Sequence, residues 1–272
     1  MMLQAISCDD FLNLQQKKIP VIDVRTPSEF ANGHIPGAFN IPLFSDEERA
    51  IVGIKYKQEN KEAAVLQGLE FVGPKLSAYV KLLHRITQKK EVLLYCWRGG
   101  QRSRSMAWLF ELAGYKIKLL EGGYKAYRNL LLQSFSRPAS LIILGGMTGS
   151  GKSEILTSIK NLGYQVIDLE KLANHKGSAF GAIGQQEQPP PQQFENDLFK
   201  VWSSLDLSKP IWLEDESVSI GRVSIPRPLF IQMRNSKVIK IEVDKKVRVV
   251  RLVKEYVGID SEELKVSVHK IA

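Results

Sequence analysis

The chain has 272 residues, 44% of them hydrophobic and 25% charged, so it is globular in composition and long enough for two domains. No apolar run reaches the roughly 20 residues of a membrane span, and the N-terminus lacks the basic and apolar stretches of a signal peptide, which predicts a cytoplasmic protein without a membrane segment. The two cysteines exclude a disulfide framework, while the net charge of +9 permits a polyanionic partner such as RNA without establishing one.

The first half of the chain alternates short apolar strands with helices. We expect strands at 19–24, 92–95 and 116–120, and helices at 46–59, 61–87 with a break near Gly73 and Pro74, 103–112 with Gly114 at its C-terminal cap, and from Gly122 to about 133. This order predicts a parallel sheet with helices on both faces, in a domain over residues 1–135.

A short polar stretch over 134–138, ended by a proline, indicates a linker, after which the alternation of strand and helix starts again. The expected strands are 141–144, 165–168, 211–213 and 238–243, and the expected helices are 152–162, 192–205 and 245–256. Residues 177–191 are rich in Gln and Pro and predict a long irregular segment. A second α/β domain over 139–272 follows.

A loop suited to holding an anion next to a thiol follows the strand at 92–95. Its members are Cys96, Arg98, Gly99, Gly100, Arg102 and Ser103. A helix N-terminus and nearby arginines stabilise a thiolate, and we expect Ser103 to cap the following helix. The alternative is a buried structural cysteine, but the arginines and glycines favour Cys96 as a catalytic nucleophile in a cradle for an anion.

The first domain resembles the rhodanese family. The matching segments are Asp23-Val24-Arg25, Glu29-Phe30, the stretch 33–38 and Gly122-Gly123-Tyr124. The resemblance implies that Cys96 accepts sulfur or a related atom. The spacing Cys-x5-Arg departs from the common sulfur-transferring members and resembles the dual-specificity phosphatases and arsenate reductases of this fold, which implies a cradle wide enough for a tetrahedral oxyanion such as phosphate or selenophosphate.

A complete Walker A sequence follows the strand at 141–144 and opens a helix. The residues that would hold a diphosphate are Gly146, Gly149, Ser150, Gly151, Lys152 and Ser153. In such a loop the backbone N–H groups surround phosphate oxygens, the lysine adds a charge, and the Ser hydroxyl can bind Mg²⁺. The loop predicts a phosphate or diphosphate ligand and does not by itself predict ATP hydrolysis.

An acidic segment at the end of the strand at 211–213 resembles a Walker B sequence. We expect Glu214, Asp215 or Glu216 to bind Mg²⁺ directly or through water, with an ordinary acidic strand end as the alternative. No Asn-Lys-x-Asp segment is present, which argues against a GTPase. We expect no tightly bound cofactor or metal.

A rhodanese-like domain joined to a P-loop NTPase-like α/β domain resembles the tRNA 2-selenouridine synthase family over the whole chain. Supporting segments are 175–181, 194–196 and 212–221. The family usually continues beyond the helix expected at 262–272, so we expect a shortened C-terminus. The resemblance implies a tRNA-modifying transferase that replaces sulfur by selenium in wobble 2-thiouridine, with selenophosphate as substrate, and that geranylates this sulfur from geranyl diphosphate.

In this interpretation Cys96 handles selenium, Arg98 and Arg102 hold selenophosphate, the Walker loop holds geranyl diphosphate, and tRNA and a selenophosphate synthetase are the expected partners. The alternatives are a Cys-dependent phosphatase or arsenate reductase, or a rhodanese sulfurtransferase with a kinase-like P-loop domain. We expect His175 to face the substrate, His34 and Cys8 to be structural, and Trp108 and Phe110 to lie in the core.

Overall fold

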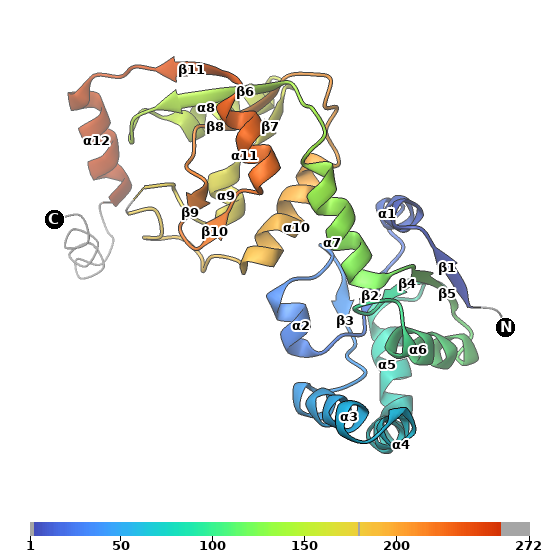
Figure 1. Ribbon diagram of the computed structural model, residues 1–272. Coiled ribbons are helices and arrows are strands. Elements are labelled where there is room, and N and C mark those ends of the chain that lie inside the picture. The colour runs from blue at the N-terminus through green and yellow to red at the C-terminus, as the bar shows by residue number, and fades with distance from the viewer. Residues whose placement is uncertain (1–2, 179, 257–272) are drawn as a thin grey trace. The chain divides into compact units, whose positions relative to one another are not determined.

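The computed structural model describes residues 3–178 and 180–256, which fall into two compact units, Met1–Leu131 and Leu132–Ala272 (Figure 1). The helix expected at 262–272 lies outside the described residues. Each unit has its own parallel sheet with helices packed on it. None of the described helices is long and apolar enough to cross a membrane.

Unit 1 contains a five-stranded parallel sheet in the order β1-β5-β4-β2-β3. Its strands are β1 (Gln4–Ile6), β2 (Val21–Asp23), β3 (Phe39–Asn40), β4 (Glu91–Tyr95) and β5 (Lys116–Leu120). Its helices are α1 (Cys8–Gln16), α2 (Pro27–Asn32), α3 (Asp46–Gln58), α4 (Lys61–Val72), the 3-10 turn η1 (Gly73–Lys75), α5 (Leu76–Ile86), α6 (Gln101–Leu112) and α7 (Gly123–Ser134).

Both faces of this sheet are buried, as a parallel sheet requires. On one face, Leu94 of β4 belongs to a core that includes Leu83 of α5 and Phe110 of α6. On the other, the ring of Tyr95 lies 6.3 Å from Phe11 of α1 and 6.2 Å from Tyr124 of α7. The alternation along β4 therefore leaves its carboxyl end, where Cys96 follows, between two packed layers.

Unit 2 contains a four-stranded parallel sheet in the order β11-β6-β8-β7 and a small antiparallel hairpin, β9-β10. Its strands are β6 (Leu141–Gly146), β7 (Gln165–Ile167), β8 (Ile211–Glu214), β9 (Ser219–Ile220), β10 (Val223–Ser224) and β11 (Lys237–Ile241). Its helices are α8 (Lys152–Asn161), α9 (Leu169–Ala173), α10 (Pro191–Trp202), α11 (Arg227–Arg234) and α12 (Lys245–Tyr256). Because β6 and β7 both pair with β8, the loops after these three strands meet at one edge.

Most predicted elements are confirmed, including the break of the second long helix at Gly73 and the strand over Lys116–Leu120. Gly114 has a positive φ of 85° and follows Ala113, the C-cap of α6, as expected for a helix end. The expectation for Trp108 was wrong: its side chain is 58% exposed, while Phe110 is fully buried. A helix that covers a sheet buries one stripe only, and Trp108 lies on the other face of α6.

Candidate active site

The cysteine loop lies between β4 and α6 and holds Cys96 against the first turn of the helix. Cys96 is 3% exposed, and its Sγ lies 3.2 Å from the Oγ of Ser103. Ser103 also donates a hydrogen bond to the carbonyl of Gly100 at 3.0 Å. The prediction that Ser103 caps α6 was wrong, because α6 begins at Gln101 and Gly100 occupies the N-cap without a side-chain bond. Ser103 instead contacts the thiol from inside the helix.

The backbone at the start of α7 is hydrogen-bonded to this loop. The N–H of Tyr124 donates to the carbonyl of Cys96 at 2.9 Å, and the N–H of Lys125 donates to that of Trp97 at 3.0 Å. Gly123 lies so close that a Cβ on it would overlap the Cys96 carbonyl and come within 2.5 Å of the Gly99 nitrogen. Its φ of 62° also belongs to the left-handed region. The Gly122-Gly123 turn is therefore part of the site.

Replacing Gly123 by alanine should distort the loop and reduce any reaction that depends on Cys96 by at least about tenfold, since a 1 Å displacement of a catalytic group can cost more than that. Gly114→Ala is a matched control: its φ is also positive, but nothing lies within 4 Å of an added Cβ. That variant should lose only about 1–2 kcal/mol of unfolding free energy and keep its activity. Equal activity losses in the two variants would contradict this account. Activity assays and urea unfolding measure both.

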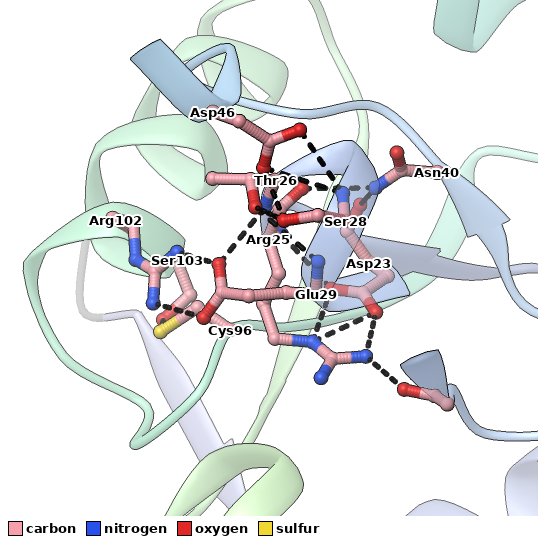
Figure 2. A network of polar contacts seen from close by, with 11 residues as sticks. Asp23, Arg25, Thr26, Ser28, Glu29, Asn40, Asp46, Cys96, Arg102 and Ser103 are labelled. Atoms are coloured by element: carbon pink, nitrogen blue, oxygen red, sulfur yellow. Dashed lines mark hydrogen bonds and ion pairs between the residues drawn. The ribbon is translucent and has the colours of Figure 1, made fainter. Parts of the chain in front are cut away.

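Arg102 is held in place by an acidic side chain from a distant helix (Figure 2). Its Nη1 and Nη2 donate to the two carboxylate oxygens of Glu29 at 2.6 and 3.2 Å. Glu29 also accepts from the N–H of Thr26 in the capping box of α2. Burial acts to raise the pKa of Glu29, but Arg102 outweighs it and holds the pKa below its usual value. The two-bond geometry fixes the guanidinium beside the loop.

The remaining members of the loop have different surroundings. Arg98 is exposed, so its charge faces solvent at the mouth of the loop. Gly99 has a φ of 66° and lies close to the Leu120 carbonyl, which leaves little room for a side chain. Gly100 is exposed at the start of α6. The N-terminus of the 12-residue helix α6, the paired Arg102 and the exposed Arg98 together favour an anion next to Cys96.

A buried ion pair lies beside this loop and was not predicted as part of the site. Asp23 and Arg25 are 0% and 1% exposed, and the guanidinium of Arg25 donates to both carboxylate oxygens of Asp23 and to the carbonyl of Gly33 at 2.8 Å. The guanidinium also lies 3.9 Å from the centre of the Tyr124 ring. Through this contact the pair connects the end of β2 to the start of α7. Figure 2 shows Asp23 and Arg25 together near Glu29.

The glycine-rich loop of unit 2 connects β6 to α8, as the Walker A spacing predicts. Gly149 and Gly151 have φ values of 79° and 83°, and α8 begins at Lys152. The Nζ of Lys152 donates to the Gly146 carbonyl at 3.1 Å, across the loop. Ser150 is 2% exposed, and its Oγ has no hydrogen-bond partner among the described residues. A buried hydroxyl without a partner, in a loop whose backbone surrounds it, can donate a hydrogen bond to a bound anion.

Three acidic residues meet beside this loop, and one of them was missed from the sequence. The hydroxyl of Ser153 donates to Glu170 Oε2 at 3.2 Å, and the N–H of Glu170 donates to Glu214 Oε1 at 2.7 Å. Burial first, and then the Glu170 carboxylate, raise the pKa of Glu216 to about 7. Asp215 lies apart from this group in an ion pair with Arg234. Glu170 was findable, because it follows the carboxyl end of a predicted parallel strand.

Comparisons with known proteins give the family. The model of the tRNA 2-selenouridine synthase AAA domain matches residues 139–270, and the rhodanese-like domain model matches residues 7–130. The tRNA 2-selenouridine synthases of Bdellovibrio bacteriovorus and Sulfurovum sp. are 44% and 40% identical to the chain, covering 94% and 96% of it and 69% and 72% of their own lengths. The chain belongs to the tRNA 2-selenouridine synthase family.

Among solved structures, the chain is similar to the N-terminal domain of a protein named as an ATP/GTP binding protein from Clostridium difficile 630. The two are 37% identical, with a TM-score of 0.45, over 47% of this chain and 99% of that domain. The two family models together match both halves of the chain, and their ranges include the cysteine loop and the glycine-rich loop.

In this tRNA 2-selenouridine synthase family member, the histidines named from the sequence have distinct places. The ring of His34 stacks on Phe30 at 3.8 Å, and its Nδ1 lies 3.0 Å from the Phe30 carbonyl. His175 is half-buried, and its Nδ1 accepts from the N–H of Gly177 at 3.2 Å. Burial lowers its pKa. A Cβ on Gly177 would meet the carboxylate of Glu216, so the His175 segment packs against the acidic group.

The stability of unit 2 should fall as the pH rises from about 5.5 to 7.5. Burial, and then the Asp168 carboxylate, raise the pKa of Glu214 to about 8. The folded chain thus holds a proton that the unfolded chain releases near its ordinary pKa of 4.5. The stabilisation is complete below that value and is lost as the pH rises toward 8. Without Mg²⁺, we expect a loss of about 1–3 kcal/mol across this interval.

Urea unfolding in EDTA at the two pH values measures this loss. Glu214→Gln, which cannot ionise, should reduce the pH dependence and leave the part that comes from Glu216, whose pKa is also raised. Glu242→Gln, at a side chain 80% exposed, should leave the pH dependence unchanged. Parallel pH dependence in the wild type and Glu214→Gln would show that Glu214 is ionised in the folded chain.

Proposed function

We propose that the chain is a tRNA-modifying transferase that replaces sulfur by selenium in 2-thiouridine at the wobble position, using selenophosphate, and that geranylates the same sulfur from geranyl diphosphate. The observation that carries the proposal is the presence of two anion-binding loops in one member of this family, only one of which contains a thiol. The relatives of the chain from Bdellovibrio bacteriovorus and Sulfurovum sp. are named tRNA 2-selenouridine synthases.

The cysteine loop is assigned to selenium. Cys96 takes or directs the selenium, while Arg98, the ordered Arg102 and the N-terminus of α6 hold the selenophosphate oxyanion. The Oγ of Ser103 lies 3.2 Å from the sulfur, and its hydroxyl hydrogen, which the Gly100 carbonyl accepts in this structure, can turn to the sulfur when Cys96 is a thiolate. The support for this assignment is the loop length together with the pairing of Arg102 with Glu29, which leaves the arginine charged and fixed.

The glycine-rich loop is assigned to the geranyl donor. Its backbone, Ser150 and Lys152 hold the diphosphate, and the thiocarbonyl sulfur of the base attacks the geranyl carbon as the diphosphate leaves. The selenium of selenophosphate then attacks C2, and the alkylated sulfur leaves as geranylthiol. Water cleaves the Se–P bond and releases phosphate, which leaves selenium on the base. No nucleotide hydrolysis is required. Basic residues, mostly in unit 1, hold the tRNA backbone, and a selenophosphate synthetase is the expected source of selenophosphate.

Magnesium fits the acidic group beside this loop as a partner of the substrate. Among the described residues, no three Asp, Glu, His or Cys side chains form a ready metal site. The Ser153 hydroxyl and the Glu170 carboxylate lie together, with Glu216 next to Glu170. Mg²⁺ usually binds one or two carboxylates together with substrate phosphates. When bound, it would neutralise charge on the leaving diphosphate.

Mass spectrometry of thiolated tRNA tests the proposal. The tRNA is incubated with the chain and geranyl diphosphate, then with selenophosphate, and its nucleosides are examined after each step. We expect the mass of a geranyl group to be added first and selenium to replace sulfur afterwards. No mass change in either step, with folded protein, would refute the proposal. Hydrolysis of a generic aryl phosphate under the same conditions would favour a phosphatase.

A further inference from the structure

Helix α12 packs directly on the glycine-rich loop. A Cβ placed on Gly149 would lie 2.9 Å from the Arg248 carbonyl and 3.0 Å from Leu252 Cγ. A Cβ on Gly151 would lie 2.5 Å from Nη1 of Arg251. Figure 1 shows α12 following β11, at the end of the sheet toward which β6 runs. The glycines of the loop therefore make room for this helix as well as for a phosphate.

The two arginines of this contact have different surroundings. Arg248 is anchored, since its Nε donates to the Val243 carbonyl at 3.2 Å and its Nη1 donates to the Thr148 carbonyl at 3.4 Å. Arg251 has no hydrogen bond to a described residue. Its only described ion pair is with Glu154 at 4.0 Å, and these side chains are 42% and 77% exposed. Such a pair contributes little, so the Arg251 guanidinium retains its donors.

Positive charge is concentrated at this point. The guanidinium of Arg251 lies against Gly151, the N-cap of α8, where the helix dipole is positive, and Lys152 follows directly. Arg248 adds a third cation on the same side of the loop. Without a ligand these cations repel one another, and the exposed carboxylate of Glu154, which also lies near Gly151, offsets only part of this repulsion. A ligand with high negative charge converts the same arrangement into a binding site.

We propose that Arg251 is a phosphate-binding residue that α12 presents to the glycine-rich loop, and that it makes the loop selective for a diphosphate over a single phosphate. The proposal rests on the assignment of the loop to a diphosphate. The loop backbone and Lys152 surround one phosphate group, and Arg251 binds the second from the α12 side. Arg248 is a positioning residue that docks α12 on Thr148.

Isothermal titration calorimetry on the full chain tests this proposal, with inorganic pyrophosphate and orthophosphate as probes. The wild type should bind pyrophosphate more tightly. Arg251→Gln should weaken pyrophosphate binding by about tenfold or more, the usual loss for one charge-assisted hydrogen bond, and change orthophosphate binding much less. Arg251→Lys should recover part of the loss. Lys246→Gln, which removes the same charge from an exposed position of α12, is the matched control and should bind like the wild type.

The outcomes separate this proposal from the assignment of the loop. If Lys152→Ala abolishes pyrophosphate binding while Arg251→Gln leaves it unchanged, the role of Arg251 is refuted and the loop keeps its assignment. An equal loss in Lys246→Gln also refutes it, because the effect would then be long-range charge. If neither the wild type nor any variant binds pyrophosphate, the assignment of the glycine-rich loop to a diphosphate is refuted, and the role of Arg251 is refuted with it. Parallel titrations with geranyl diphosphate and ADP show whether the loop binds a prenyl diphosphate or a nucleoside diphosphate more tightly.

Discussion

Replacing Cys96 by alanine should abolish the selenation of tRNA, by at least about a thousandfold, and leave geranylation within about twofold of the wild type. In the proposed function, selenation depends on the thiol of the cysteine loop, whereas geranylation uses a loop that contains no thiol. The change removes one sulfur atom from a side chain that is 3% exposed, so we expect the fold to persist. Mass spectrometry of the two products, with thermal unfolding as a check, measures the effect.

Cys8→Ala is the control for this experiment. Burial, and then Asp9, raise the pKa of Cys8 to about 12, so its thiol is uncharged at neutral pH and is not a nucleophile. This variant should keep both activities. Equal loss of selenation and geranylation in Cys96→Ala would contradict the division of the two reactions between the loops, and full selenation would exclude Cys96 from the chemistry.

Replacing Asp23 by asparagine should destabilise unit 1 by about 3–5 kcal/mol, because it leaves the Arg25 charge buried without its counter-charge. Both side chains are at most 1% exposed, so bulk solvent is excluded from the pair. The proximity of the guanidinium to Tyr124 recovers only a small part of this energy. Urea unfolding followed by circular dichroism gives the change in unfolding free energy.

Glu59→Gln is the matched control, since it removes the same charge from an ion pair with Lys55 whose side chains are 52% and 35% exposed. We expect a loss of less than about 1 kcal/mol there. The double variant Asp23→Asn, Arg25→Met buries no charge and should recover part of the stability lost in Asp23→Asn. A double variant as unstable as the single one would show that packing, and not the unpaired charge, sets the cost.

The sequence predicted those parts of the fold that depend on local signals. The run over 92–95 is apolar at every position because β4 is covered on both faces, and the Cys96 loop follows it as expected. The Walker spacing placed Gly151 and Lys152 at a helix start, which the structure confirms. In both cases the chemistry of a few consecutive residues determines the conformation.

Three helices with proline in their first turn were either not predicted from the sequence or predicted to begin too late. Helices α2 and α10 begin with Pro27 and Pro191 as their first residues, and Pro228 is the second residue of α11. We expected α10 only from residue 192, and α2 and α11 not at all. Proline is favoured in the first turn of a helix because its missing N–H has no partner there. For α2, the capping box of Thr26 and Glu29 was a second signal that identifies the helix start.

The contacts that complete the two loops join residues far apart in the chain. The pair of Arg102 with Glu29 spans 73 positions, and the contact of Arg248 with Thr148 spans 100. No periodicity or local motif encodes such pairs, because they depend on which strands become neighbours. The β2-β4 pairing brings Glu29 to Arg102, and the β11-β6 pairing brings α12 to the glycine-rich loop.

The backbone bonds from Tyr124 and Lys125 to the cysteine loop limit how this site can change during evolution. Besides these bonds, a Cβ on Gly123 would lie 2.8 Å from the Arg98 nitrogen and 2.5 Å from the Gly99 nitrogen. A residue inserted or deleted after Trp97 would therefore disturb the contact of the loop with the first turn of α7. A length change therefore requires a compensating change at Gly123. Single substitutions at the exposed Arg98 and Gln101 are not limited in this way, because they leave the length of the loop unchanged. New anion preferences in this family should thus arise more readily from side chains at the mouth of the loop than from a loop of different length.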